Sequence, residues 1–237
     1  MNDSRNPISP HLQIYRWQIS SLISITHRIT GILNLLGLIF ICAWISSAGI
    51  GENFFESFSV FLKSFVGKFI LIGFTWSMSF HLLSGIRHFF LGFRLWIRNK
   101  NSKSFRNYSD YWFVIFNDYF MDDWQRINLM RAARKWIFQR ISALIIAPLI
   151  IWFLISLISL STEDYNSVIN FFSKPLFLFL TIILLITGFF HAKIGLSEIY
   201  EDYIQDEKIK NVANILTFLL SIVVPLVTII LLLYKFL

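Results

Sequence analysis

The sequence contains little charge and a single cysteine. Only 15% of its 237 residues are charged, whereas 56% are hydrophobic and 26 are phenylalanine. This composition excludes an ordinary soluble domain, in which about a quarter of the residues are charged, and it makes lipid the expected solvent. Cys42 lies inside an apolar run, where it can form neither an intramolecular disulfide nor a multi-thiolate metal site, so we expect it to serve packing.

Two further features are missing. The first twenty residues contain Pro7, Pro10, His11 and Arg16 but no apolar core behind a basic start, so we predict no cleavable signal peptide. No internal repeat, low-complexity linker or strict coiled-coil heptad is evident, so neither a solenoid nor a coiled coil is predicted.

Five apolar runs dominate the chain instead. A helix needs about 20 apolar residues to cross a hydrocarbon core of about 30 Å, and each run is long enough. None shows the alternation over about ten residues that marks a barrel strand. The sequence therefore predicts an all-α integral membrane helical bundle with five transmembrane helices. We expect the spans at about residues 21–47, 66–93, 139–160, 175–200 and 211–236.

The distribution of basic residues predicts the orientation of these spans. Residues 94–140 carry ten lysines and arginines, whereas residues 49–65 and 161–174 carry only Lys63 and Lys174. The positive-inside rule places residues 94–140 in the cytoplasm or matrix, so we expect the N-terminus inside and the C-terminus outside. The net charge of +7 thus indicates membrane orientation, and we expect lipid and no nucleic acid as a partner.

An aromatic stretch interrupts the inner segment. Residues 108–124, YSDYWFVIFNDYFMDDW, include four aspartates. A carboxylate in the middle of a membrane costs about 2.5 kcal/mol or more, so a sixth span is not expected here. We predict an interfacial or subunit-contacting segment.

Two histidines lie inside predicted spans, where an ionisable side chain is a functional candidate. His81 on the second span and His191 on the fourth each lie about 10 to 13 residues from the inner end, and so at similar depth. Gly85 and Gly195 follow them at i+4 and leave a smooth patch for a flat macrocycle. This pattern suits bis-histidine ligation of a b-type haem iron between the second and fourth helices. Each histidine could instead bond to a neighbouring helix, and zinc fits less well because only two deep ligands are available.

A positive cluster is expected on the inner side of the two histidines. It comprises His27, Arg28, Arg87, His88 and Arg140. Haem propionates need cationic partners near the interface, and Arg87 and His88 lie about 9 to 10 Å along the helix from His81. We predict these five residues to bind the haem; the alternative is that they snorkel or set the topology. Lys193 lies about 200° from His191 on a helical wheel, so we expect it to snorkel or to pair with another group.

A second candidate site lies at the inner end of the fourth span. Asp202 and Tyr203 follow His191 by eleven and twelve residues and return to nearly the same helix face. A phenol there can donate to a quinone carbonyl, and the hydroxyl of Ser24, one turn before Arg28, can serve the same site. The alternative is ordinary interfacial use, because Tyr is common at membrane interfaces and Asp caps loops.

Two long motifs indicate a family for the first half. Residues 7–31, PISPHLQIYRWQISSLISITHRITG, and residues 81–88, HLLSGIRH, closely resemble the cytochrome b556 subunit of succinate dehydrogenase. Its S-x-x-H-R-x-[ST] and H-x-x-x-G-x-R-H elements are both present. They comprise Ser24, His27, Arg28 and Thr30, then His81, Gly85, Arg87 and His88.

The second half resembles a different subunit of the same enzyme. Residues 136–203 are similar to the hydrophobic small anchor subunit, with His191, Asp202 and Tyr203 in its H-x(10)-D-Y pattern. The resemblance thus covers nearly the whole chain and implies two anchor subunits fused into one polypeptide. The implied division is a cytochrome b556-like half at 1–107, a connector at 108–135 and a small-anchor-like half at 136–237.

The resemblance implies the membrane anchor of a succinate:quinone oxidoreductase, in a bacterial or mitochondrial inner membrane. In that family the first histidine of each motif ligates haem b, which carries over to His81 and His191. The implied ubiquinone site comprises Ser24, Arg28, Asp202 and Tyr203. A flavoprotein and an iron-sulfur subunit dock on the inner face and carry out the succinate chemistry, so this chain would be a non-hydrolytic enzyme subunit that passes electrons to ubiquinone.

The sequence departs from the family pattern in three places. Asn6 stands where the family usually has Arg, and Gly92 where it usually has Asp. The first subunit of the family normally has a third span, and here the stretch at 108–124 stands in its place. Without that span, the second half of the chain would begin on the inner side of the membrane.

Two rival functions remain open from the sequence. A single-chain di-haem anchor of a fumarate reductase also has five spans, but it needs four ligating histidines on four helices, and the third and fifth spans here have none. A haem-free structural anchor or small transporter is a rival of another class.

Overall fold

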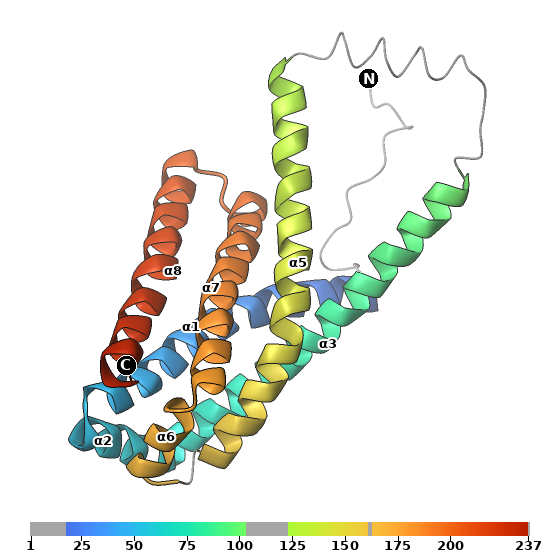
Figure 1. Cartoon of the computed structure of the whole chain (residues 1–237). Coiled ribbons are helices and arrows are strands. Elements are labelled where there is room, and N and C mark those ends of the chain that lie inside the picture. Colours follow the sequence, from blue (N-terminus) through green and yellow to red (C-terminus); the bar gives the residue numbers. More distant parts are fainter. Residues whose placement is uncertain (1–17, 103–122, 161–162, 237) are drawn as a thin grey trace.

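The described parts of the chain are helical throughout. The computed structural model describes residues 18–102, 123–160 and 163–236, and it has no β-strand among them. The helices of these parts are α1 (Ile19–Ile50), α2 (Glu52–Lys63), α3 (Phe65–Ser102), α5 (Asp123–Leu160), α6 (Tyr165–Phe172), α7 (Pro175–Tyr203) and α8 (Glu207–Phe236) (Figure 1). The predicted all-α class is confirmed.

Five of these helices are long and apolar enough to cross a membrane. The apolar segments are α1, Phe65–Leu91 of α3, Arg134–Leu160 of α5, α7 and α8. They overlap the five predicted spans, so the predicted five-span bundle is confirmed. Figure 1 shows α3 and α5 both continuing beyond the bundle toward its upper side.

Two short helices, α2 and α6, occupy segments that the sequence analysis treated as loops. Gly51, with φ of 152°, separates α1 from α2 and adopts a conformation that favours glycine. Asp164 caps α6 by accepting a hydrogen bond from the Ser167 amide at 2.9 Å. Hydrogen bonding to the Ser167 side chain and then to this amide lowers the pKa of the Asp164 carboxyl. Phe55 of α2 and Phe172 of α6 are buried in the core, which explains why both segments fold back onto the bundle.

Local signals also set the ends of α7, the helix that carries most of the candidate site. Pro175 stands in its first turn, where its missing N–H costs no hydrogen bond. The helix ends at Tyr203, and Asp206 then caps α8 by accepting bonds from the amides of Lys208 and Ile209 at 2.8 and 3.1 Å. Tyr203 is therefore held at a defined helix terminus.

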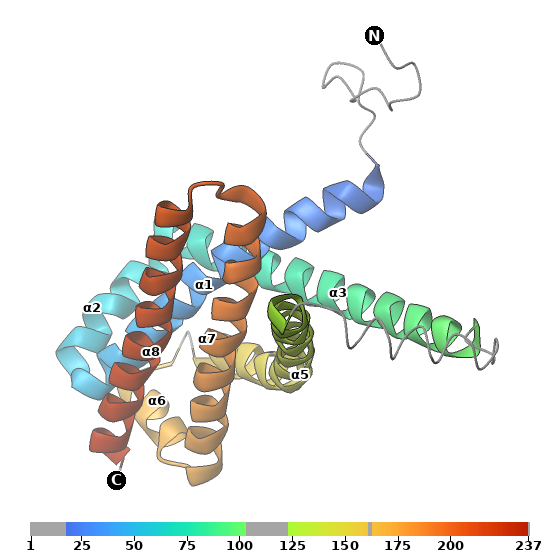
Figure 2. The ribbon, with the colours of Figure 1, turned by 90° about the horizontal axis from the view of Figure 1, so that it is seen from above.

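The α1 helix lies at the centre of the bundle. It packs against α2, α3, α7 and α8, while α5 packs mainly against α7. Seen from above, α7 and α8 run side by side and α1 crosses behind them (Figure 2). At Gly37 of α1 an added Cβ would lie 1.8 Å from the Phe74 ring of α3, so any larger residue here would force that ring to move.

The apolar core gathers at the end of the bundle that holds α2 and α6. Its buried members come from all seven described helices except α3, and they include Trp44, Phe153, Phe172 and Leu232, each at most 3% exposed. Partly buried side chains of α3, such as Phe74, pack against this cluster. The opposite half of the bundle contains the candidate polar residues.

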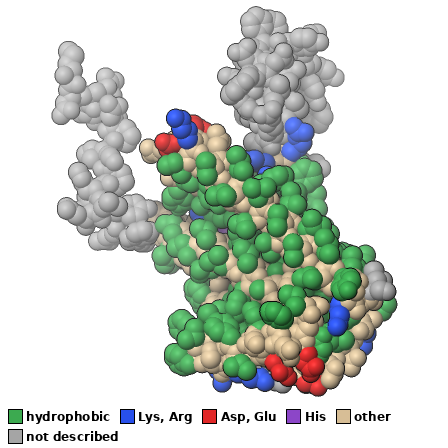
Figure 3. Space-filling model, turned by 90° about the vertical axis from the view of Figure 1, so that its left-hand side faces the viewer, with side chains coloured by type: hydrophobic (Ala, Val, Ile, Leu, Met, Phe, Trp, Pro, Cys, Tyr) green, Lys and Arg blue, Asp and Glu red, His purple; other side chains and the backbone are tan. Residues whose placement is uncertain are grey.

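Large hydrophobic side chains also cover the outside of the molecule. Phe65, Phe69 and Ile72 of α3 are at least 70% exposed. Figure 3 shows hydrophobic side chains over the middle of the visible face and charged side chains near its upper and lower ends. An apolar belt between two charged ends is the surface expected for a protein surrounded by lipid.

Two predictions lie outside the described residues. They concern the first seventeen residues and, except for Asp123 and Trp124 at the start of α5, the aromatic stretch at 108–124.

Candidate functional site

The structure brings His81 of α3 and His191 of α7 together. Their ring centroids are 6.5 Å apart and the ring planes are perpendicular. Two metal–nitrogen bonds of about 2 Å, together with the ring radii, would separate the centroids of two imidazoles that bind one metal by about 6 Å. The observed spacing therefore suits two ligands of one metal.

The hydrogen bonds of His81 define its tautomer. Its Nδ1 lies 3.1 Å from the backbone carbonyl oxygen of His27 and 3.3 Å from Oγ1 of Thr30. A carbonyl oxygen only accepts, so Nδ1 carries the proton and donates. Nε2 is left with its lone pair, which is the form of the ring that binds a metal.

His191 has the same tautomer, held by residues of α5. Its Nδ1 lies 2.9 Å from Oγ of Ser142, and that hydroxyl donates its own hydrogen to the Gln139 carbonyl at 3.1 Å. Its Nε2 lies 3.4 Å from the amide nitrogen of Gln139, which can only donate. The lone pair is again on Nε2.

The glycines predicted to face a macrocycle lie beside polar side chains. His27 stacks on His81 with centroids 3.9 Å apart and also meets the edge of the His88 ring at 5.7 Å. A Cβ on Gly85 would lie 3.8 Å from His27, and a Cβ on Gly195 would lie 3.2 Å from the amide nitrogen of Gln139. The His27 and Gln139 side chains thus lie against these two glycines, and a macrocycle beside them stays a prediction.

The donor set nevertheless fits a haem. Nδ1 of His27 and Oε1 of Gln139 are buried and have no hydrogen-bond partner in the described structure. Both atoms lie in residues that touch the imidazoles of the pair, so the site has unused capacity for a polar ligand group. Among the described residues no group of three or more His, Cys, Asp and Glu could hold a bare metal ion.

A second polar group lies at the C-terminal end of α7. A guanidinium nitrogen of Arg28, on α1, forms an ion pair of 2.8 Å with Asp202, and another donates to the Tyr203 hydroxyl oxygen at 3.0 Å. The Arg28 and Asp202 side chains are 38% and 52% exposed. This arrangement, which we call the Arg28 group, unites three of the four predicted quinone residues.

The remaining candidates lie near these two groups without joining them. Arg140 lies 3.9 Å above the ring of Trp136, one turn earlier on α5. Arg87 is exposed on α3, and Ser24 is half-buried on α1. Within the described residues neither forms a hydrogen bond or ion pair with the histidines or with the Arg28 group.

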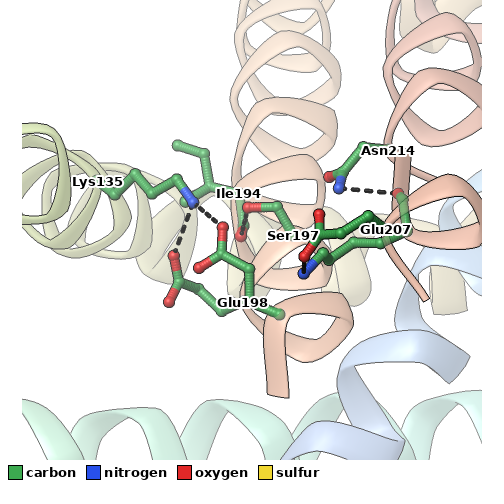
Figure 4. A network of polar contacts seen from close by, with 8 residues as sticks. Lys135, Ile194, Ser197, Glu198, Glu207 and Asn214 are labelled. Atoms are coloured by element: carbon green, nitrogen blue, oxygen red, sulfur yellow. Dashed lines mark hydrogen bonds and ion pairs between the residues drawn. The ribbon is translucent and has the colours of Figure 1, made fainter. Parts of the chain in front are cut away.

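Lys193 lies apart from the histidine pair, on a groove of about 570 Å³ between α5, α7 and α8. The neighbouring Lys135 forms ion pairs with Glu201 at 2.5 Å and Glu198 at 3.3 Å (Figure 4). The groove is lined by Lys135, Lys193, Ser197, Glu201, Asn211, Asn214, Ile215 and Phe218.

The sequence analysis missed two residues that touch His191, namely Gln139 and Ser142. They stand three residues apart and so on one face of α5, at the start of an apolar run. Two polar side chains with helical spacing in a span are a usable signal for a buried contact. Thr30 was recognised only as part of a motif, and its contact with His81 was not predicted.

Comparison with known families covers almost the whole chain. The sequence model of the family described as succinate dehydrogenase/fumarate reductase transmembrane subunit matches residues 2–116 and 119–232. No solved structure matches the chain.

Curated relatives include both cytochrome b subunits and a hydrophobic anchor subunit. The succinate dehydrogenase cytochrome b556 subunit of Paracoccus denitrificans is 37% identical over 90 residues, which cover 38% of this chain and 69% of that protein. The subunit of the same name from Rickettsia prowazekii is 36% identical over 87 residues, covering 37% and 67%. The succinate dehydrogenase hydrophobic membrane anchor subunit of Rickettsia bellii is 31% identical over 103 residues, covering 44% and 82%.

Proposed function

The chain belongs to the succinate dehydrogenase/fumarate reductase transmembrane subunit family, and we propose that it binds one haem b and reduces ubiquinone as the membrane anchor of a succinate:quinone oxidoreductase. The observation that carries the proposal is the pair of imidazoles 6.5 Å apart, each with Nδ1 engaged and Nε2 as its lone-pair nitrogen. Electrons would reach the chain from an iron-sulfur partner on the inner face.

His81 and His191 would hold the haem through its iron. Such a haem, when bound, supplies one-electron exchange between its ferric and ferrous forms. His27 and His88 would contact it from α1 and α3, because both rings already adjoin His81 or each other. Arg87 and Arg140 supply cationic side chains for propionates, and neither has a carboxylate partner among the described residues.

The Arg28 group would bind the quinone. Arg28 donates to the Tyr203 oxygen, so the phenol keeps its own hydrogen for a quinone carbonyl. The cation beside it also makes the phenol a stronger donor as negative charge develops on the quinone oxygen. Asp202 holds Arg28 in this orientation, and Ser24, on the preceding turn of α1, would supply a further hydroxyl.

The overall reaction balances between subunits. Succinate loses two electrons and two protons in the flavoprotein partner to give fumarate, and the quinone gains two electrons and two protons to give the quinol. The exposure of the Arg28 group would let protons enter from the inner aqueous phase. This chain binds no succinate itself.

Two features support fused anchor subunits. The family model matches two successive segments that meet near residue 117, and the relatives include both kinds of anchor subunit. These features favour a cytochrome b556-like half at 1–107 and a small-anchor-like half at 136–237, joined by residues 108–135.

The proposal requires the inner ends of α1, α3, α5 and α7 to share one side of the membrane. Single cysteines at Gln205 and Ser57, introduced into a Cys42→Ala background, should be labelled by a membrane-impermeant maleimide from opposite sides. Both side chains are exposed, Gln205 between α7 and α8 and Ser57 on α2. Labelling of both from the same side would refute this orientation.

Purification in mild detergent tests the function itself. The chain should co-purify with a flavoprotein and an iron-sulfur subunit, and the complex should show a low-spin b-type spectrum at one haem per chain. A complex that transfers electrons from succinate to ubiquinone without any b-type haem would reject the haem assignment and retain the anchor role.

A further inference from the structure

Ser142 contacts the histidine pair from a helix that carries none of the motif residues. It lies on α5, is 4% exposed, and places Oγ 2.9 Å from Nδ1 of His191. The same oxygen donates its hydrogen to the Gln139 carbonyl at 3.1 Å. A hydroxyl has one hydrogen and two lone pairs, so this oxygen accepts a bond from the imidazole N–H.

The two histidines differ in how their Nδ1 atoms are held. His81 donates toward a backbone carbonyl, that of His27, and toward the Thr30 hydroxyl. No side-chain substitution removes a carbonyl. Nδ1 of His191 has the Ser142 hydroxyl as its side-chain acceptor at 2.9 Å, and the Gln139 backbone carbonyl is a further acceptor for this imidazole. The Ser142 hydroxyl is therefore the acceptor of His191 that a substitution can remove.

We propose that Ser142 is a positioning residue for His191, which keeps the ring proton on Nδ1, fixes the ring orientation and presents Nε2 to a haem iron. The inference rests on the proposed haem site and adds to it a residue on the third span. Ser142 is a buried polar side chain in the membrane-spanning part of α5, where such a group is costly unless it is bonded. The proposal gives this side chain a function.

The hydrogen bond has two chemical consequences. Donation from Nδ1 raises the electron density of the imidazole and so strengthens Nε2 as a ligand, more for the ferric than for the ferrous iron. Without the acceptor, the proton can move to Nε2 and block the ligating atom. Loss of an outer partner of this kind typically weakens metal binding by about 10- to 100-fold.

A matched pair of variants isolates the hydroxyl. Ser142→Thr and Ser142→Val add nearly the same volume, but only Thr retains a hydrogen-bond acceptor. In the purified complex we expect the Val variant to lose haem per chain or to show a higher midpoint potential. If the site binds ferric relative to ferrous haem ten times less strongly than in the wild type, the midpoint potential rises by about 59 mV. The Thr variant should stay near the wild type in both measurements.

Two further variants control for packing. Thr30→Val removes a hydroxyl that lies 3.3 Å from Nδ1 of His81, whereas the Ser142 hydroxyl lies 2.9 Å from Nδ1 of His191, so its effect on the midpoint potential should be smaller than that of Ser142→Val. Ser142→Ala removes the hydroxyl without adding volume and should reproduce the Val result.

The outcomes separate this inference from the haem proposal. Equal haem content and equal midpoint potentials in the Thr and Val variants, or a wild-type midpoint in Ser142→Ala, would overturn the role of Ser142. Retention of an unaltered b-type spectrum in His191→Ala would instead overturn the ligand assignment, whatever the Ser142 variants do.

Discussion

The histidine pair and the Arg28 group share helix α7 but are held by different kinds of contact. The histidines are fixed by a carbonyl and by hydroxyls from α1 and α5, all within the bundle. The Arg28 group is an ion pair with a bound phenol, roughly half exposed at the helix end. Hydrogen bonds in a dry interior hold one geometry, whereas an exposed ion pair contributes only about 0–1 kcal/mol and can rearrange.

This difference matches two tasks. A permanently bound cofactor requires ligands that are positioned before it arrives, because ordering them at binding would cost affinity. A substrate that enters and leaves requires donors that are reachable from outside. The same helix can serve both because twelve residues, about 18 Å, separate His191 from Tyr203.

Removal of both histidines should have the largest effect. The His81→Ala, His191→Ala double variant should lose its b-type spectrum completely, because no iron ligand then remains at this depth. Reduced-minus-oxidised spectra of the purified complex measure this loss. Thr187→Val is a matched control, because this residue lies one turn before His191 and its hydroxyl bonds only to its own helix. An unaltered spectrum in the double variant would contradict the proposed haem site.

Arg28→Leu should have the second largest effect, and this variant should retain its haem. The substitution removes both the ion pair with Asp202 and the bond to Tyr203. We expect succinate:ubiquinone activity to fall by more than about tenfold, that is, by over about 1.4 kcal/mol of barrier. Arg28→Lys keeps the charge but not the planar fork, so it should recover only part of the activity.

Succinate oxidation by an artificial dye provides the control for Arg28→Leu. The dye accepts electrons upstream of the quinone, so this activity should remain near normal. If both activities fell together, Arg28 would be structural and the quinone site would have to lie elsewhere.

Tyr203→Phe should have a smaller effect, of about tenfold, because Arg28 and Asp202 remain in place. In the proposed site, the lost group would be a single hydroxyl beside the charge that develops on the quinone. Ubiquinone and dye activities measured in parallel give the result. Tyr200→Phe removes a hydroxyl from the same helix that bonds instead to Thr217 of α8, so it should leave the ratio of the two activities unchanged. Equal ratios in both variants would contradict a special role for Tyr203.

Lys135→Met should change activity by less than about twofold. Lys135 also forms ion pairs with α7, with Glu198 and Glu201, but in the described structure these three residues have no bond to the Arg28 group. Exposed pairs of this kind contribute about 0–1 kcal/mol to stability. Ubiquinone activity in membranes is the measurement. A loss as large as that of Arg28→Leu would show that the general charge of the inner face, and not the Arg28 group, governs quinone reduction.

The sequence alone determined the class of the protein and its five spans. Runs of about 20 apolar residues can be accommodated only as helices across a bilayer, so the spans follow without any tertiary information. The two histidines and the Arg28, Asp202 and Tyr203 side chains were identified from their cost in a membrane and from motif spacing. The short helices α2 and α6 were missed because their apolar faces become useful only against the core around Phe172.

Only the tertiary structure decided which side chains meet. Spacing along one helix gives depth and face, but not the neighbouring helix that faces it. His81 and His191 are 110 residues apart in the sequence, and their approach depends on how α3 and α7 pack with α1 and α5. The same packing places Ser142 and Gln139 against His191, and His27 and Gln139 over the glycines expected to face a macrocycle. Such contacts are set by interhelical geometry, which no local pattern specifies.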